Sequence, residues 1–138
     1  LVVFILVIIT LHYILPIIKF IYYPWNLIGT VPIFIGIVLN LVADRAFKKI
    51  GTTVKPYEES TGLLAYGAFK FSRHPMYLGM ALILLGLSIF LRSLSPFAMV
   101  AVFVCTMEKL FVQIEEQMME KTFGSEYLEY KKKVRKWV

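Results

Sequence analysis

The sequence has a single cysteine, two histidines and none of the common catalytic loops. Cys105 lies within an apolar run and has no second cysteine to pair with, so no intramolecular disulfide can form. His12 and His74 lie on different segments without a cysteine or carboxylate at ligand spacing, which argues against a metal site. The sequence also lacks a Gly-rich phosphate loop, a G-x-G-x-x-G run and a serine nucleophile elbow. Metal, nucleotide-loop and serine-hydrolase chemistry are therefore disfavoured.

Charged residues are scarce as well. They make up 17% of the 138 residues, and hydrophobic residues make up 59%, whereas a soluble domain has about 25% and roughly 45–50% respectively. The net charge of +6 does not indicate nucleic acid, because much of the basic charge lies near the ends of apolar segments and no aromatic-interleaved basic groove occurs. The composition predicts one integral membrane domain, in contact with the lipid bilayer and without a nucleic-acid partner.

Long apolar runs are abundant. They predict an all-α, multi-pass transmembrane bundle of about four spans, over residues 1–23, 26–43, 76–91 and 94–112. Only Arg92-Ser93 separates the last two spans, which should form a tight helical hairpin. The chain then divides into N-terminal transmembrane helices (1–43), a loop (44–75), the hairpin (76–112) and a C-terminal helical region (113–138). Basic residues concentrate in the loop and the tail, so both are expected to face the cytoplasm.

The first two spans carry further signals. Residues 1–23 lack a basic leader region and a cleavage site, so they are expected to form a membrane helix, interrupted by Pro16 and ending in an aromatic belt, rather than a signal peptide. In the second span, Gly29 and Gly36 lie on one helix face, as Gly79 and Gly86 do in the third. Such faces allow close helix packing. The Gly29/Gly36 face can pack within the chain or against a second copy, which leaves a homodimer open.

Two charged clusters flank the predicted hairpin. Arg73 and His74 precede Pro75, which suits the first turn of the third helix, and Glu115-Glu116 follow the fourth span. A hairpin brings both clusters to one membrane face, where Arg73 and His74 could hold a carboxylate and the glutamates an ammonium. The tail should be helical, with a break at Phe123-Gly124.

A plainer interpretation of these clusters stays open. Arg73 would anchor to lipid phosphate and His74 would cap the third helix. Glu116 and Glu120 would form an ordinary acidic helix end that pairs with Lys109 or Lys121. Glu108, seven residues before Glu115, should share its helix face and lies close to the apolar run, where a carboxylate is costly unless it is paired or hydrated.

The clusters also belong to longer motifs. These are Gly51-Thr52-Thr53-Val54-Lys55-Pro56, Gly67-Ala68-Phe69-Lys70, Ser72 to Gly79 (SRHPMYLG), and a C-terminal pattern of Glu115, Glu116, Met119, Phe123, Gly124, Tyr127, Tyr130, Val134 and Arg135. Together they resemble the isoprenylcysteine carboxyl methyltransferase and phospholipid methyltransferase families over roughly residues 51–137. Two departures are apolar exchanges: Ala68-Phe69 stands where Pro-Tyr is commoner, and Met119 replaces Leu.

The resemblance implies an S-adenosylmethionine-dependent methyltransferase that acts on a lipophilic small molecule or lipid by in-line displacement. It implies cofactor-binding roles for Gly67, Lys70, Arg73, His74, Pro75, Tyr77, Gly79, Glu115, Glu116 and Tyr127, and catalytic roles for Glu116, Tyr130 and Arg135. A carboxylate or thiolate acceptor would need no general base, whereas an amine or phenol would need Glu116, Tyr130 or His74. The acceptor is expected to arrive laterally between the small-residue faces of the second and third spans.

Two other functions remain open at this stage. Sterol-reductase-type membrane enzymes also resemble this arrangement and would use NADPH, although Met80 follows Gly79 where an acidic residue or tryptophan is frequent in them. A non-enzymatic membrane helper or lipid-binding protein could keep the same fold. Binding of S-adenosylmethionine, of NADPH, or of neither would separate the three.

Overall fold

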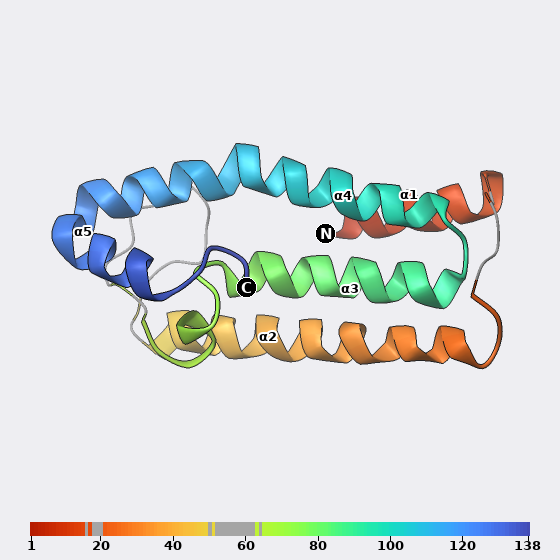
Figure 1. Cartoon of the computed structure of the whole chain (residues 1–138), viewed down its shortest axis with the longest axis horizontal. Helices are drawn as coiled ribbons and strands as arrows, with labels where there is room; N and C mark the ends of the chain where they lie inside the picture. Colours follow the sequence, from red (N-terminus) through yellow and green to blue (C-terminus); the bar gives the residue numbers. More distant parts are fainter. Residues whose placement is uncertain (16, 18–20, 50, 52–62, 64) are drawn as a thin grey trace. The chain divides into compact units, whose positions relative to one another are not determined.

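The described part of the chain is all-helical, as predicted. The computed structural model describes the chain except for residues 16, 18–20, 50, 52–62 and 64. Its elements are the α-helices α1 (Val2–Ile14), α2 (Thr30–Lys49), α3 (Pro75–Leu91), α4 (Ser95–Met107) and α5 (Gln113–Lys133), the 3₁₀ turns η1 (Trp25–Gly29) and η2 (Gly67–Lys70), and the π-helical turn η3 (Glu108–Val112) (Figure 1). The motif predicted at residues 51–56 falls outside the described residues, apart from Gly51.

The helices form two compact units. The first unit comprises Leu1–Val38 and Gly79–Cys105, and the second comprises Leu39–Leu78 and Thr106–Val138. Each unit brings together segments that are far apart in the sequence, because a helical hairpin folds the chain back on itself. The candidate charged clusters both belong to the second unit.

Glycine pairs hold α2 and α3 together in the first unit. A Cβ added at Gly36 would lie 2.4 Å from the carbonyl oxygen of Gly79, and one added at Gly29 would lie 2.4 Å from that of Gly86. Contacts this short require two backbones that touch without intervening side chains. The Gly29/Gly36 face thus packs within the chain and offers nothing to a second copy. The predicted lateral route between these faces was wrong, because they are closed against each other.

The first predicted span is shorter than expected. α1 ends at Ile14, two residues before Pro16, because proline excludes the helical conformation from the residue that precedes it. Its 13 residues extend about 20 Å, less than the ~30 Å of hydrocarbon in a bilayer. Residues 1–23 are therefore not one continuous helix. Trp25 of the predicted aromatic belt opens η1 instead.

The other predicted boundaries hold with adjustments. α2 runs to Lys49, into the segment predicted as a loop from residue 44. α3 begins at Pro75 and α4 at Ser95, as the two prolines predicted, and Arg92 makes the tight turn between them in a left-handed conformation (φ 67°). Among the described residues, the helical stretches Trp25–Lys49 and Ser95–Lys133 are long and apolar enough to cross a bilayer. The expected count of four spans stays a prediction.

Two small apolar cores support the second unit. In one, Phe69 of η2 packs on Ala43 and Ala46 of α2. In the other, Tyr127, Tyr130 and Val134 pack together with Leu63, Met119 and Phe123. Gly124 breaks the helical geometry inside α5 (φ 50°, ψ −120°), where the sequence predicted a break at Phe123-Gly124. The break redirects the end of α5, so that both the start and the end of this helix contribute to the charged cluster.

Candidate functional site

Arg73 and His74 are held at the start of α3 by their own backbone. The Ser72 hydroxyl accepts a hydrogen bond from the His74 N–H at 3.2 Å, and the His74 carbonyl accepts one from Leu78. Pro75, the first helical residue, needs no partner for a missing N–H. These contacts fix the direction in which the Arg73 and His74 side chains leave the turn.

The π turn sets the register of the acidic residues. Two turns of an α-helix take about 7 residues, but the extra residue in a π turn makes eight the interval between aligned side chains. Glu108 therefore aligns with Glu116 rather than with Glu115 as the sequence predicted. Lys136 shows this directly, because its Nζ lies 2.7 Å from Glu108 Oε1 and 3.7 Å from Glu116 Oε2.

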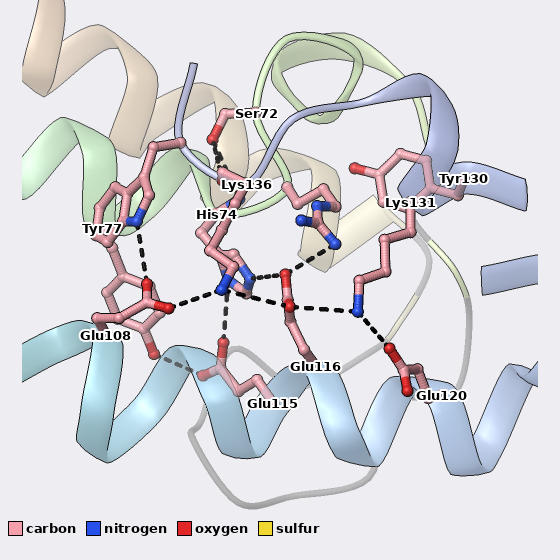
Figure 2. Close-up of polar contacts among 12 residues, drawn as sticks. Ser72, His74, Tyr77, Glu108, Glu115, Glu116, Glu120, Tyr130, Lys131 and Lys136 are labelled. Atoms are coloured by element: carbon pink, nitrogen blue, oxygen red, sulfur yellow. Dashed lines mark hydrogen bonds and ion pairs between the residues drawn. The ribbon is translucent and has the colours of Figure 1, made fainter. Parts of the chain in front are cut away.

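Glu116 is the centre of the cluster (Figure 2). Its Oε1 lies 2.9 Å from Arg73 Nη1 and 3.4 Å from His74 Nε2. Its Oε2 lies 3.7 Å from the ammonium groups of both Lys131 and Lys136. The side chains of Arg73 and Glu116 are each only 8% exposed, so little water screens this pair. The two clusters predicted from the sequence do meet, and they meet as a buried ion pair.

Glu115 has different surroundings from those of its neighbour. Its carboxylate accepts a hydrogen bond from the Tyr77 hydroxyl at 2.5 Å and lies 3.4 Å from His74 Nδ1. Its side chain is 28% exposed, whereas that of Glu116 is 8% exposed. The His74 and Tyr77 rings stack with centroids 5.9 Å apart. Glu115 is thus the more accessible carboxylate of the two and has fewer cations around it.

Several buried polar atoms in this cluster lack a hydrogen-bond partner. They are Arg73 Nε, Arg73 Nη1, His74 Nε2 and Glu116 Oε1. Arg73 Nη1 and Glu116 Oε1 are close enough for an ion pair, yet they lack the alignment of a hydrogen bond. Unsatisfied buried donors and acceptors are uncommon and costly in native proteins. A ligand with both an anionic and a cationic group could satisfy them.

Charges shift the pKa values of His74 and Glu116 in opposite directions. Burial lowers the pKa of the His74 imidazole, but its contacts with Glu115 and Glu116 outweigh burial and raise that pKa above 6.5. Burial raises the pKa of Glu116, but His74, Arg73 and Lys136 outweigh it and lower that pKa below 4.5. Both shifts favour the charged forms, as opposite charges at close range require.

Tyr127, Tyr130 and Arg135, also predicted here, take structural positions. Burial, helped by the charge of Glu116, raises the pKa of Tyr127 to about 12. The Tyr130 hydroxyl donates a 2.6 Å hydrogen bond to the Phe69 carbonyl, and burial raises its pKa as well. Arg135 offers its backbone carbonyl to the Arg73 N–H at 3.1 Å, while its side chain is exposed. This geometry does not favour the predicted catalytic roles of Tyr130 and Arg135.

The remaining predicted residues lie outside the ion-pair cluster. Gly67 opens η2 with a left-handed conformation (φ 61°), which favours glycine. Lys70 is exposed at the end of the same turn. Gly79 belongs to the first unit, where its carbonyl packs on Gly36. Helix packing accounts for this glycine, and its cofactor role stays a prediction.

Sequence reasoning missed the contribution of the tail. Lys131 and Lys136 supply cations to Glu116, and Lys131 also lies 2.5 Å from Glu120. The predicted pairs with Lys109 and Lys121 were wrong. Lys131 follows Tyr127 by four residues, and this spacing on one helix face was a signal that could have separated Lys131 from the exposed lysines that follow it.

Comparison with known proteins decides the family. A sequence profile described as phospholipid methyltransferase matches residues 25–126. The chain belongs to the phospholipid methyltransferase family. Within this family context, the chain is 35% identical over 95 residues to a Protein-S-isoprenylcysteine O-methyltransferase of Saccharomyces cerevisiae, an alignment that covers 67% of this chain and 38% of the yeast protein.

Two further relatives of this phospholipid methyltransferase family member agree. Protein-S-isoprenylcysteine O-methyltransferase A of Arabidopsis thaliana is 31% identical over 114 residues, 77% of this chain and 55% of the plant protein. A solved structure of the eukaryotic intramembrane Ras methyltransferase ICMT has the same fold, with a TM-score of 0.74 at 23% identity over 99% of this chain and 50% of that one. The chain thus spans about half or less of the length of these proteins.

Proposed function

We propose that this chain is an integral membrane methyltransferase that uses S-adenosylmethionine and methylates a lipophilic acceptor, with its site on the cytoplasmic side. The observation that carries the proposal is the cluster of buried, unsatisfied donors and acceptor at Arg73, His74 and Glu116, in a chain of the phospholipid methyltransferase family. The amino-acid head of S-adenosylmethionine has both the carboxylate and the ammonium that such atoms can bind.

The surroundings of each charged group suggest how the head would be held. Arg73 Nε and Nη1 are suited to its carboxylate, because they are buried donors without a hydrogen-bond acceptor. Glu115 is better suited than Glu116 to its ammonium, because Arg73, Lys131 and Lys136 would repel a further cation at Glu116. Glu116 would instead hold Arg73 in place. This assignment narrows the predicted roles of the two glutamates.

Positioning and exclusion of water would carry the chemistry. When bound, S-adenosylmethionine supplies an electrophilic methyl group on a positively charged sulfonium. The chain's own contribution is to fix the donor's head, so that a lipid-borne nucleophile meets the methyl group in line. His74 between two carboxylates and the hydrogen-bonded Tyr130 both tend to keep their protons, which suits an acceptor that needs no base. The prenylcysteine-type carboxylate is such an acceptor, and a phospholipid amine would be the alternative.

Equilibrium binding to the purified protein in detergent tests the proposal. Labelled S-adenosylmethionine should bind the full chain, and NADPH should not. Glu115→Gln should weaken binding of S-adenosylmethionine about tenfold, which is what loss of one charge-assisted hydrogen bond of about 1.5–3 kcal/mol provides at its lower end. Glu129→Gln is the matched control, because Glu129 is 62% exposed and pairs only with Lys132 among the described residues. NADPH binding would favour the reductase, and binding of neither ligand would favour the helper protein.

A further inference from the structure

Glu108 lies outside the proposed ligand contacts, yet both of its carboxylate oxygens have partners from the C-terminal segment. Lys136 Nζ lies 2.7 Å from Oε1, and Trp137 Nε1 donates to Oε2 at 3.1 Å. The two partners are consecutive residues. Glu108 therefore fixes the segment after α5 at two adjacent points, and it does so from the π turn (Figure 2).

The opposite edge of the same segment is attached to the turn before α3. The Arg135 carbonyl accepts from the Arg73 N–H at 3.1 Å, and the Lys136 carbonyl accepts from the Ser72 hydroxyl at 3.1 Å. Ser72 is only 1% exposed. The segment 134–137, termed here the strap, is thus held by its backbone on the Arg73 side and by two side chains on the Glu108 side.

The strap delivers a charge to the centre of the cluster. Lys136 Nζ lies between the carboxylates of Glu108 and Glu116 and within 3.7 Å of both. It reaches this position because the π turn aligns Glu108 with Glu116. Without the negative charge of Glu108, Lys136 would lose its closest partner and its position beside Glu116 would no longer be fixed.

We infer that Glu108 is a positioning residue for the methyl-donor site. It acts through Lys136 and Trp137: by anchoring the strap, it holds Lys136 against Glu116 and keeps Glu116 paired with Arg73. The inference rests on the proposed function, because the site that it positions is the one assigned there to the head of S-adenosylmethionine. Nothing in the role requires Glu108 to touch the ligand.

Titration calorimetry with S-adenosylmethionine tests the inference, because it reports affinity and the fraction of competent protein separately. Glu108→Gln keeps the size of the side chain and removes its charge, and it should raise the dissociation constant about tenfold at unchanged stoichiometry. Trp137→Phe removes only one hydrogen bond and should raise it about threefold. Glu129→Gln should leave it unchanged. A lower stoichiometry at an unchanged dissociation constant would show a purely structural role and would overturn the inference.

A second readout does not depend on the ligand. In a Trp25→Phe background, Trp137 is the remaining tryptophan, and its quenching by acrylamide reports whether the strap is attached. Glu108→Gln should increase this quenching in protein without ligand. Unchanged quenching would overturn the inference even if the affinity fell. If the unsubstituted chain fails to bind S-adenosylmethionine at all, the proposed function fails instead, and the quenching result still decides whether Glu108 anchors the strap.

Discussion

Removal of one partner from the buried Arg73–Glu116 pair should have unequal consequences on the two sides. Glu116 keeps His74, Lys131 and Lys136 nearby when Arg73 is replaced. Arg73 has Glu116 as its only carboxylate partner among the described residues. Glu116→Gln should therefore destabilise the protein more than Arg73→Gln does, although both changes remove the same 2.9 Å ion pair.

The size of the effect follows from the distance and the burial. Two unit charges 2.9 Å apart attract by about 6 kcal/mol gross at an effective dielectric constant of about 20. Leaving one charge of a buried pair uncompensated costs about 3–5 kcal/mol, which is the expectation for Glu116→Gln. For Arg73→Gln we expect about 1–3 kcal/mol, the cost of one poorly satisfied group. In a chain of this size, 1 kcal/mol shifts Tm by about 3–5 °C.

Thermal unfolding of the ligand-free protein in detergent at pH 7, followed by circular dichroism, measures both variants. Glu116→Gln should lower Tm by about 10 °C or more and Arg73→Gln by less. The double variant should lose less than the sum of the two single losses, because the two residues are in contact. An equal loss, or a greater loss for Arg73→Gln, would show that the other cations do not compensate Glu116 and would refute the reasoning.

Three further predictions concern pH, packing and a tyrosine. The protonated form of His74 stabilises the fold, since its folded pKa is raised above 6.5; this stabilisation is fully present below the unfolded pKa of about 6.5 and is lost as pH rises through the folded value. The Tm advantage of the unsubstituted protein over His74→Asn should therefore shrink between pH 6 and 9, and a constant difference would contradict this. Gly36→Ala places a Cβ 2.4 Å from the Gly79 carbonyl oxygen and should cost about 1–3 kcal/mol in thermal unfolding; an unchanged Tm would rule out the close α2–α3 contact. Tyr130→Phe loses the hydrogen bond to Phe69 and should cost about 1–2 kcal/mol while kcat stays within about threefold; a fall of 10²-fold or more, typical of a lost general base, would restore the predicted catalytic role.

Local signals in the sequence located most of the helices. The prolines at positions 75 and 96 marked the starts of α3 and α4, because proline suits the first turn of a helix. Glycines spaced seven apart marked the contact faces of α2 and α3. The end of α1 was missed, because hydrophobicity continues through residues 15–23 while the constraint from Pro16 acts on the backbone alone.

The candidate site was predictable in part. The meeting of Arg73-His74 with Glu115-Glu116 follows from a hairpin between two charged clusters, which the sequence shows. The different partners of Glu115 and Glu116 do not, because they depend on a π turn that has no simple sequence signature. The contribution of Lys136 was equally hidden, since it depends on how the chain turns after the end of α5.

Transfer of a labelled methyl group tests the central claim most directly. Membranes that contain the chain are incubated with methyl-labelled S-adenosylmethionine, and the extracted lipid is assayed for label. The account predicts label in a lipophilic product, its loss with Glu115→Gln at a donor concentration below the dissociation constant, and its retention with Glu129→Gln. Absence of label for the unsubstituted chain on membranes rich in prenylcysteine and phospholipid acceptors, or label that is unaffected by Glu115→Gln, would contradict it.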